Sequence, residues 1–252
     1  MNIEFLTFLK REIYRFMVLY KQTIIPALIS SLLYIVVFGS TLGSRISTIN
    51  GVPYINFIIP GLVMMSVITQ AYQNSASSIM QAKYLKFIED ILIAPLSGMQ
   101  ISLGYIIGGT IRGIICGLSI LIMCLFITDL KINNFLLTIF YLLTVSWTFS
   151  AFGVIIGIMA KSWDEIGSFS NFVFMPMTFL GGVFYSLDML PPLWRNISYI
   201  NPIYWMISGL RYSTLGLEEN ANFISLIICF GFSCIFTAIA TYMFKTGYKI
   251  KS

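Results

Sequence analysis

Few residues of this 252-residue chain could carry out catalysis, and their placement argues against it. The sequence contains no histidine, and its carboxylates all fall in an amphipathic N-terminal segment or in polar loops. Histidine-based acid–base catalysis and imidazole metal sites are therefore excluded. Carriers driven by protons or sodium usually keep ionisable groups near the middle of their spans, and such groups are scarce here. We predict no catalytic, cofactor-binding or metal-ligating residue.

A phosphate-binding loop is also missing from the sequence. The pattern G-x-x-x-x-G-K-[ST] requires a Gly-Lys pair, and the chain contains none. If ATP drives this protein, a separate subunit must bind the ATP and its magnesium ion.

Arg112 is the single charge within an apolar run of the sequence. It lies about 12 residues into that run, or roughly 18 Å along a helix. A central arginine costs roughly 2.5–3.5 kcal/mol on insertion scales, so its side chain must face protein, water or an anion. Two interpretations stay open. Arg112 either contacts an acidic headgroup or lines a polar path, or it is a structural residue that bonds to carbonyl groups or extends its side chain to the membrane interface.

Two further groups of side chains are candidates for a substrate path. Gln70 and Asn74 close an apolar run with polar side chains, as a cytoplasmic entrance or as an ordinary wet helix end. Met175 and Phe179 lie in a later run, where they either pack or accept an apolar cargo. Together with Arg112, these four residues form the predicted path.

The segment from Lys83 to Leu92 is the best candidate for a docking surface. Its apolar residues recur at helical spacing and could fill a groove on a partner or rest on lipid. Glu89 and Asp90 could steer a partner with a basic rim. The alternative is an ordinary helix at the membrane interface. The apolar members of this predicted stripe are Tyr84, Phe87, Ile88, Ile91 and Leu92.

Composition identifies the elements that must position these residues as membrane helices. Apolar residues make up 58% of the chain and charged residues only 10%, against about 25% charged in a soluble protein. The mean hydropathy is +0.87. Apolar runs near 20 residues favour helices over strands. We predict an all-α integral membrane protein with a single transmembrane domain over residues 1–252.

The pattern predicts six transmembrane helices after an amphipathic N-terminal helix at residues 1–21. That first helix either lies in the headgroup plane or serves only as a basic segment that fixes orientation. Short helices that dip into the interface are expected between spans five and six. A cytoplasmic segment, 77–98, follows span two. The predicted apolar face of the N-terminal helix comprises Leu6, Leu9, Ile13, Phe16, Met17 and Tyr20, and the predicted spans are 23–42, 54–75, 100–127, 135–160, 169–185 and 223–244.

Glycines recur every four residues in two of the predicted spans. Small residues at this spacing let helix backbones approach closely in lipid. We therefore expect the third and fourth spans to approach neighbouring helices closely. These glycines are Gly104 and Gly108, then Gly109, Gly113 and Gly117, and in the next span Gly153 and Gly157.

The distribution of basic residues predicts that both termini are cytoplasmic. With the N-terminus inside, ten Lys and Arg fall on the cytoplasmic side and four on the other. The net charge of +5 therefore suits membrane orientation, and no nucleic acid is expected as a partner. The cytoplasmic bases are Lys10, Arg11, Arg15, Lys21, Lys83, Lys86, Lys161, Lys245, Lys249 and Lys251, and those opposite are Arg45, Lys131, Arg195 and Arg211.

Five stretches in order resemble the membrane subunit of ABC-2 type ATP-binding-cassette exporters. The resemblance is nearest to the bacterial YadH-type permeases and weaker to the NodJ and daunorubicin-resistance permeases. It covers nearly the whole chain. The stretches are F-I-I-P-G-L-V-M-M-S at 57–66, I-E-D-I-L-I-A-P-L-S at 88–97, G-G-T-I-R-G at 108–113, F-L-G-G-V-F-Y-S-L-D-M-L-P-P at 179–192 and N-P-I-Y-W-M-I-S-G-L-R-Y at 201–212.

This resemblance implies a six-span half-transporter of an exporter in the inner membrane. Two copies of the chain would form a homodimer and dock on two ABC ATPase subunits. Residues 88–95 would belong to the coupling region, the N-terminal helix would also contact the ATPase, and re-entrant helices would cap the path outside. The cargo would be lipid-like or amphipathic. A membrane scaffold or sensor that docks a cytoplasmic partner without transport is the alternative.

Overall fold

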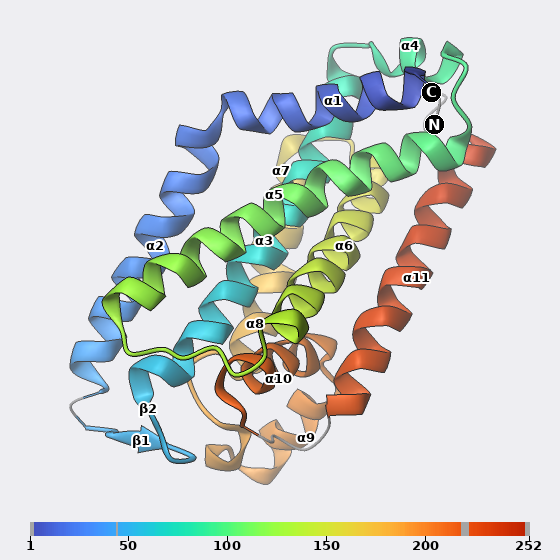
Figure 1. The fold of residues 1–252 in the computed structure, drawn as a ribbon. Coiled ribbons are helices and arrows are strands. Elements are labelled where there is room, and N and C mark those ends of the chain that lie inside the picture. The colour runs from blue at the N-terminus through green and yellow to red at the C-terminus, as the bar shows by residue number, and fades with distance from the viewer. Residues whose placement is uncertain (1–2, 44, 218–221, 250–252) are drawn as a thin grey trace.

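The computed structural model describes residues 3–43, 45–217 and 222–249. The regular secondary structure of these residues is helical except for one small hairpin (Figure 1). Lys251, which the orientation count includes, lies outside these residues. Five of the described helices are long and apolar enough to cross a membrane, which confirms an all-helical membrane protein. These are α2 (Tyr20–Thr41), α3 (Tyr54–Tyr84), α5 (Gly98–Ile127), α6 (Phe135–Met159) and α11 (Asn222–Thr246).

Helix α3 is the centre of the bundle, because it packs against α2, α5, α6 and α10. Side chains on all its sides are buried, including Phe57, Met64 and Tyr72. A helix that is apolar all round belongs inside a bundle. The helix also continues to Tyr84, well past the predicted end of span two at residue 75.

The glycine prediction is confirmed by the contacts of α5 and α6. A Cβ atom built on Gly109 would lie 2.2 Å from Oγ of Ser75, and one on Gly153 would lie 2.5 Å from the carbonyl oxygen of Tyr72. Gly104 and Gly108 instead face another helix, α1 (Ile3–Val18). Helix α5 therefore uses two glycine faces to hold two different neighbours.

The fifth predicted span, residues 169–185, has the wrong boundaries. The structure forms α7 (Trp163–Phe169), a π-helical turn (Ser170–Phe174) and α8 (Met175–Leu180) as one uninterrupted helical run. Pro176 has no N–H to donate within the helix, which favours a locally altered hydrogen-bond pattern. The run ends at Gly181-Gly182, where Gly182 has a φ of 74°.

Short elements gather at the end of the bundle opposite α1 (Figure 1). They are a 3₁₀ turn (Leu187–Met189), α9 (Pro192–Ile200), α10 (Pro202–Leu215) and an antiparallel hairpin of β1 (Thr48–Ile49) and β2 (Val52–Pro53). The hairpin was not predicted, although Asn50-Gly51 supplies the two positive φ angles that such a turn needs.

Arg211 on α10, which the orientation count places on the outer side, is buried in the protein. Only 1% of its surface is exposed. Its guanidinium lies 3.9 Å from the centre of the Phe57 ring, and its Nη2 donates to the carbonyl oxygen of Gly182 at 2.7 Å. Arg211 therefore joins α10 to α3 and to the turn after α8.

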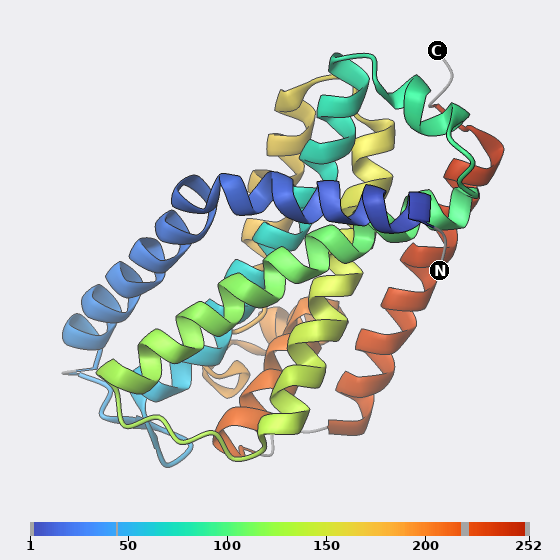
Figure 2. The ribbon, with the colours of Figure 1, turned by 45° about the horizontal axis from the view of Figure 1, so that its top comes forward.

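Helix α1 crosses the other end of the bundle and lies over α5 (Figure 2). Its protein-facing stripe consists of Phe5, Phe8, Glu12 and Phe16. Of the apolar face predicted from sequence, only Phe16 is buried, so the predicted face is not the one that packs on protein.

Valine substitutions at two glycines test the close approach of α6 to α3. Gly153→Val should lower the free energy of unfolding by about 1–3 kcal/mol, because its side chain meets the α3 backbone. Gly231→Val on α11 is the matched control, since no atom lies within 4 Å of the added Cβ. Thermal unfolding of both variants in detergent would measure the difference, and equal melting temperatures would contradict the packing.

Candidate functional site

The predicted docking helix is two elements in the structure. Helix α3 ends at Tyr84, Lys86 takes a φ of 60°, and α4 (Ile88–Ile93) begins after this turn. The predicted apolar stripe is therefore not one continuous helical face. Ile88 and Ile91 are buried in the protein's own core.

The residues that α4 and its flanks leave exposed differ from that stripe. Glu89 and Asp90 are exposed, as are Tyr84 and Ile93, while Phe87 and Leu92 are half-buried. A partner that contacts α4 would therefore meet Glu89, Asp90 and Ile93, and not the buried Ile88 and Ile91.

Contacts on both sides of α4 involve the residues that flank it in the chain. The Arg11 guanidinium of α1 lies 5.1 Å from the ring centres of both Phe8 and Phe87. On the other side, Ser97 and Gln100 form a capping box at the start of α5, with hydrogen bonds of 3.2 and 2.8 Å. Such reciprocal caps stabilise the start of α5. Ile88 and Ile91 of α4 share a buried cluster with Phe8 of α1 and Ile101 of α5, and this cluster connects the three helices.

Lys83 joins the end of α3 to the end of α6. Its Nζ donates to the carbonyl oxygens of Ile158 at 2.9 Å and Ala160 at 2.7 Å. A cation at a helix C-terminus satisfies carbonyls that have no partner within the helix. The turn that precedes α4 is thereby linked to α6 as well.

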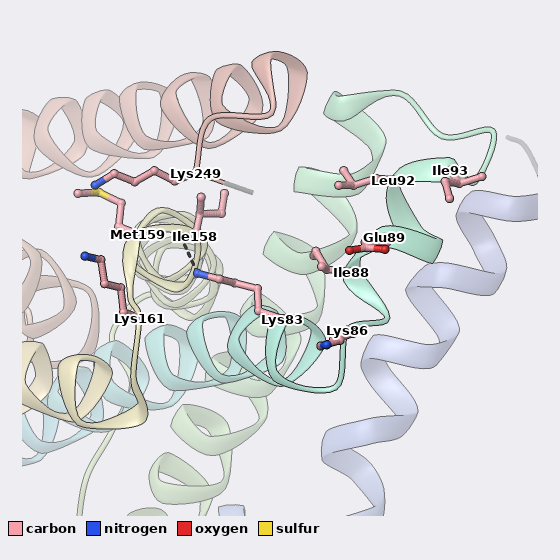
Figure 3. A pocket seen from close by; sticks show the side chains of 10 residues that line it. All are labelled: Lys83, Lys86, Ile88, Glu89, Leu92, Ile93, Ile158, Met159, Lys161 and Lys249. Atoms are coloured by element: carbon pink, nitrogen blue, oxygen red, sulfur yellow. Dashed lines mark hydrogen bonds between the residues drawn. The ribbon is translucent and has the colours of Figure 1, made fainter. Parts of the chain in front are cut away.

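A hollow of about 930 Å³, which we call the basic hollow, lies beside α4. Figure 3 shows four lysines and the single carboxylate of Glu89 around it. This excess of positive charge suits an acidic partner surface. The lysines are Lys83, Lys86, Lys161 and Lys249.

On the other side of α4, a groove of about 790 Å³ separates it from α1. Its lining is mostly apolar, with Glu4, Arg11 and Asp90 among its charged residues. Helix α4 is therefore flanked by a basic hollow and a largely apolar groove.

Glu12 is a buried carboxylate that the sequence analysis did not single out. Its Oε2 accepts from Oγ of Ser78 at 2.5 Å, its Oε1 accepts from Arg11 at 2.9 Å, and Oε2 lies 3.7 Å from Nε of Arg15. Its position four residues from both Phe8 and Phe16, on the buried stripe, is a sequence signal that could have revealed it. Glu12 thus ties α1 to α3.

Arg15 extends this contact toward the predicted path. Its Nη2 donates to the backbone and side-chain oxygens of Asn74, at 2.9 and 3.1 Å. Burial lowers the pKa of the Arg15 guanidinium, and the Glu12 carboxylate opposes that shift.

Three of the five predicted path residues come together in the structure. Arg112 donates to Oε1 of Gln70 from Nε at 3.0 Å and from Nη2 at 2.5 Å. It also donates to Oδ1 of Asn74 at 3.5 Å. Arg112 lies one helical turn from Gly108, where Glu12 of α1 packs, so it is close to the layer formed by α1.

Among the described residues, no hydrogen bond or ring contact links Met175 or Phe179 to this cluster. Both lie on α8 with 44% and 38% of their surface exposed. Phe179 stacks on Phe184 at 5.6 Å, and Phe184 in turn stacks on Phe38 of α2 at 4.6 Å. The predicted path therefore divides into a polar cluster and an aromatic cluster.

Comparison with known proteins gives a consistent family assignment. Residues 3–215 match the model of the ABC-2 type transporter family. The inner membrane transport permease YadH of Escherichia coli strain K12 is 42% identical over 226 residues, which cover 90% of this chain and 87% of that protein. Nodulation protein J of Rhizobium leguminosarum is 23% identical over 86% of this chain and 83% of its own length.

The chain belongs to the ABC-2 type transporter family. As an ABC-2 type permease, it is a membrane subunit of an ABC transporter. The family match ends at the last residue of α10, so it includes α1, α4 and the Arg112 cluster.

Removal of the buried charge on α1 tests the contact between α1 and α3 in this permease. Glu12→Gln should lower the free energy of unfolding by about 1–3 kcal/mol, because the two neighbouring guanidinium groups lose their counter-ion. Glu4→Gln on the exposed side of α1 is the control and should change little. Thermal unfolding in detergent would measure both, and an unchanged Glu12→Gln melting temperature would contradict this role.

Proposed function

We propose that this permease is the transmembrane half of an exporter of the bacterial inner membrane. Two copies would face each other, and two separately encoded ABC ATPase subunits would bind ATP and magnesium. Closure of the ATPases would move α4 and release a lipid-like or amphipathic molecule outward.

The observation that carries this proposal is the way in which α4 is held. Its acidic face is exposed, while Arg11, the Ser97–Gln100 capping box and Lys83 connect its surroundings to α1, α5 and α6. A push on α4 would therefore move several helices together. This supports coupling through residues 84 and 87–92, with the exposed carboxylates rather than the apolar stripe as the first contact.

The topology in this proposal has six spans. Besides the five long helices, the remaining span is the helical run of residues 163–180, which is the fifth in chain order. It is about 27 Å long at 1.5 Å per residue, close to the thickness of the hydrocarbon core. Helices α9 and α10 would be the re-entrant elements on the outside. Helices α1 and α4 and the end of α11 lie together at the opposite end, which supports two cytoplasmic termini (Figure 1).

An amphipathic cargo is supported by a surface along α2. A groove of about 240 Å³ between α2 and α3 is lined by several polar side chains, among them Gln70 and Gln73. A second hollow shares Ser30 and Tyr34 with it and extends to Phe38 of the aromatic cluster. Most of α2 is unburied, which leaves it free to face a second copy.

Charge reversal on α4 tests the docking of the ATPase. The double variant Glu89→Arg and Asp90→Arg should abolish co-purification of the ATPase from cells that express both subunits. The reason is that two arginines would then face the basic rim that we expect on the ATPase. Asp129→Arg, an exposed carboxylate near the start of the loop before α6, should leave co-purification unchanged.

The same pair of subunits in vesicles separates transport from a scaffold role. ATP-dependent movement of an amphipathic fluorescent substrate is expected with the wild type and should be lost in the double variant. If the ATPase binds but nothing moves, or if charge reversal leaves binding intact, the coupling proposal is wrong.

Cysteine labelling tests the orientation. In a background with the exposed Cys234→Ser, an impermeant thiol reagent applied to intact spheroplasts should label Lys131→Cys but not Glu89→Cys. Permeabilised membranes should label both. Labelling of the α4 position in intact spheroplasts would place α4 outside and contradict the mechanism.

A further inference from the structure

Arg112 is a buried cation that, among the described residues, donates hydrogen bonds only to neutral amide oxygens. Only 9% of its surface is exposed. None of the ion pairs in the described part of the chain includes it, since Glu12 pairs with Arg11 and Arg15. A buried charge without a counter-ion is costly, and it favours the uptake of an anion.

The way in which Gln70 contacts Arg112 resembles that of an anionic ligand. One amide oxygen accepts from both Nε and Nη2 of the guanidinium. This edge of an arginine fits the two oxygens of a carboxylate or phosphate, whose charge-assisted bonds are roughly twice as strong as neutral ones. An anion that reaches Arg112 would therefore displace Gln70.

Gln70 is also the point at which Arg112 meets a groove. The Gln70 side chain is half-buried and lines the groove between α2 and α3. That groove contains polar side chains that a purely lipid-facing surface would not need, and Oγ of Ser66 within it is buried and has no partner in the described residues. Movement of Gln70 into the groove would open a polar route to Arg112. The polar side chains of the groove are Ser30, Ser31, Ser66, Thr69, Gln70 and Gln73.

The charges around Arg112 add to its preference for an anion. Asn74 accepts hydrogen bonds from both Arg15 and Arg112, which brings two guanidinium groups to one amide. Arg11 joins the same network through Glu12. The network therefore contains three guanidinium groups and the single carboxylate of Glu12.

We propose that Arg112 binds the phosphate or carboxylate headgroup of an amphiphile that enters from the α2–α3 groove and displaces Gln70. When the ligand is absent, Gln70 accepts hydrogen bonds from the guanidinium and so lowers the free-energy cost of burying its charge. The apolar part of the ligand would lie along the groove toward Tyr34 and Phe38. This proposal rests on the transport function above and specifies the chemistry of its cargo, but the binding step needs no ATPase.

Equilibrium binding to the purified permease tests the proposal. The permease would be placed in nanodiscs of phosphatidylcholine and titrated with dodecyl phosphate, dodecyl maltoside or inorganic phosphate. We expect dodecyl phosphate to bind at least tenfold more tightly than either of the other two. Equal binding of the neutral maltoside, or inorganic phosphate as tight as dodecyl phosphate, would overturn an amphiphile headgroup as the ligand.

Two matched substitutions locate the binding site. Gln70→Glu places a permanent carboxylate against Arg112 and should weaken dodecyl phosphate binding at least tenfold. Gln73→Glu adds the same charge to the same groove, but Arg112 donates its hydrogen bonds to Gln70 and Asn74 and not to Gln73. This variant should weaken binding less than threefold. Gln70→Ala, which removes the competing amide, should bind at least as tightly as the wild type.

The two glutamate variants also separate this inference from the proposed function. Equal loss of binding in both variants would show a general charge effect and overturn the role of Arg112. Melting temperatures near that of the wild type would establish that both variants are folded. If Gln70→Glu binds dodecyl phosphate as tightly as the wild type, the proposed headgroup site is wrong. If the same variant also co-purifies with the ATPase, the transporter assignment stands.

Discussion

The close approach of α3, α5 and α6 is the constraint on which the rest of the structure depends. In lipid, helix association relies on packing and interhelical hydrogen bonds, and glycines provide the necessary proximity. Ser75 and Ser150 share a hydrogen bond of 2.7 Å beside Gly109, so small polar side chains add to the contact. Because these three helices form one core, α1 and α4 have a firm base on which to lie.

Around this core, the half-buried Lys83 and the buried Arg112 and Arg211 donate hydrogen bonds to neutral oxygens. Lys83 uses carbonyls at the end of α6, Arg211 uses the carbonyl of Gly182 and the Phe57 ring, and Arg112 uses side-chain amides. Glu12 is the exception among the described residues, since it supplies a buried carboxylate. These hydrogen bonds join neighbouring helices.

The sequence predicted the long spans and the family well, because both depend on patterns that the chain carries locally. Hydropathy identified α2, α3, α5, α6 and α11, and glycine spacing identified helix faces that approach their neighbours closely. Prediction was poorer where a helix breaks. The turn at Lys86 interrupts a pattern that looks continuous as helical periodicity. The helical run of residues 163–180 begins and ends earlier in the chain than the predicted fifth span. Glu12 and Arg211 were missed as buried charges because a polar residue near an apolar run is usually solvated.

The sequence by itself determined that this is a helical membrane protein of the ABC-2 type, since apolar runs must span lipid as helices and the family motifs follow in order. Only the tertiary structure decided which side chains meet. It placed Gln70 and Asn74 against Arg112, turned Ile88 and Ile91 into the core, and left Glu89 and Asp90 exposed. The physical reason is that partners such as Arg112 and Gln70 lie 42 residues apart in the chain. Their contact depends on how α3 and α5 are rotated when their small residues pack, which no local pattern specifies.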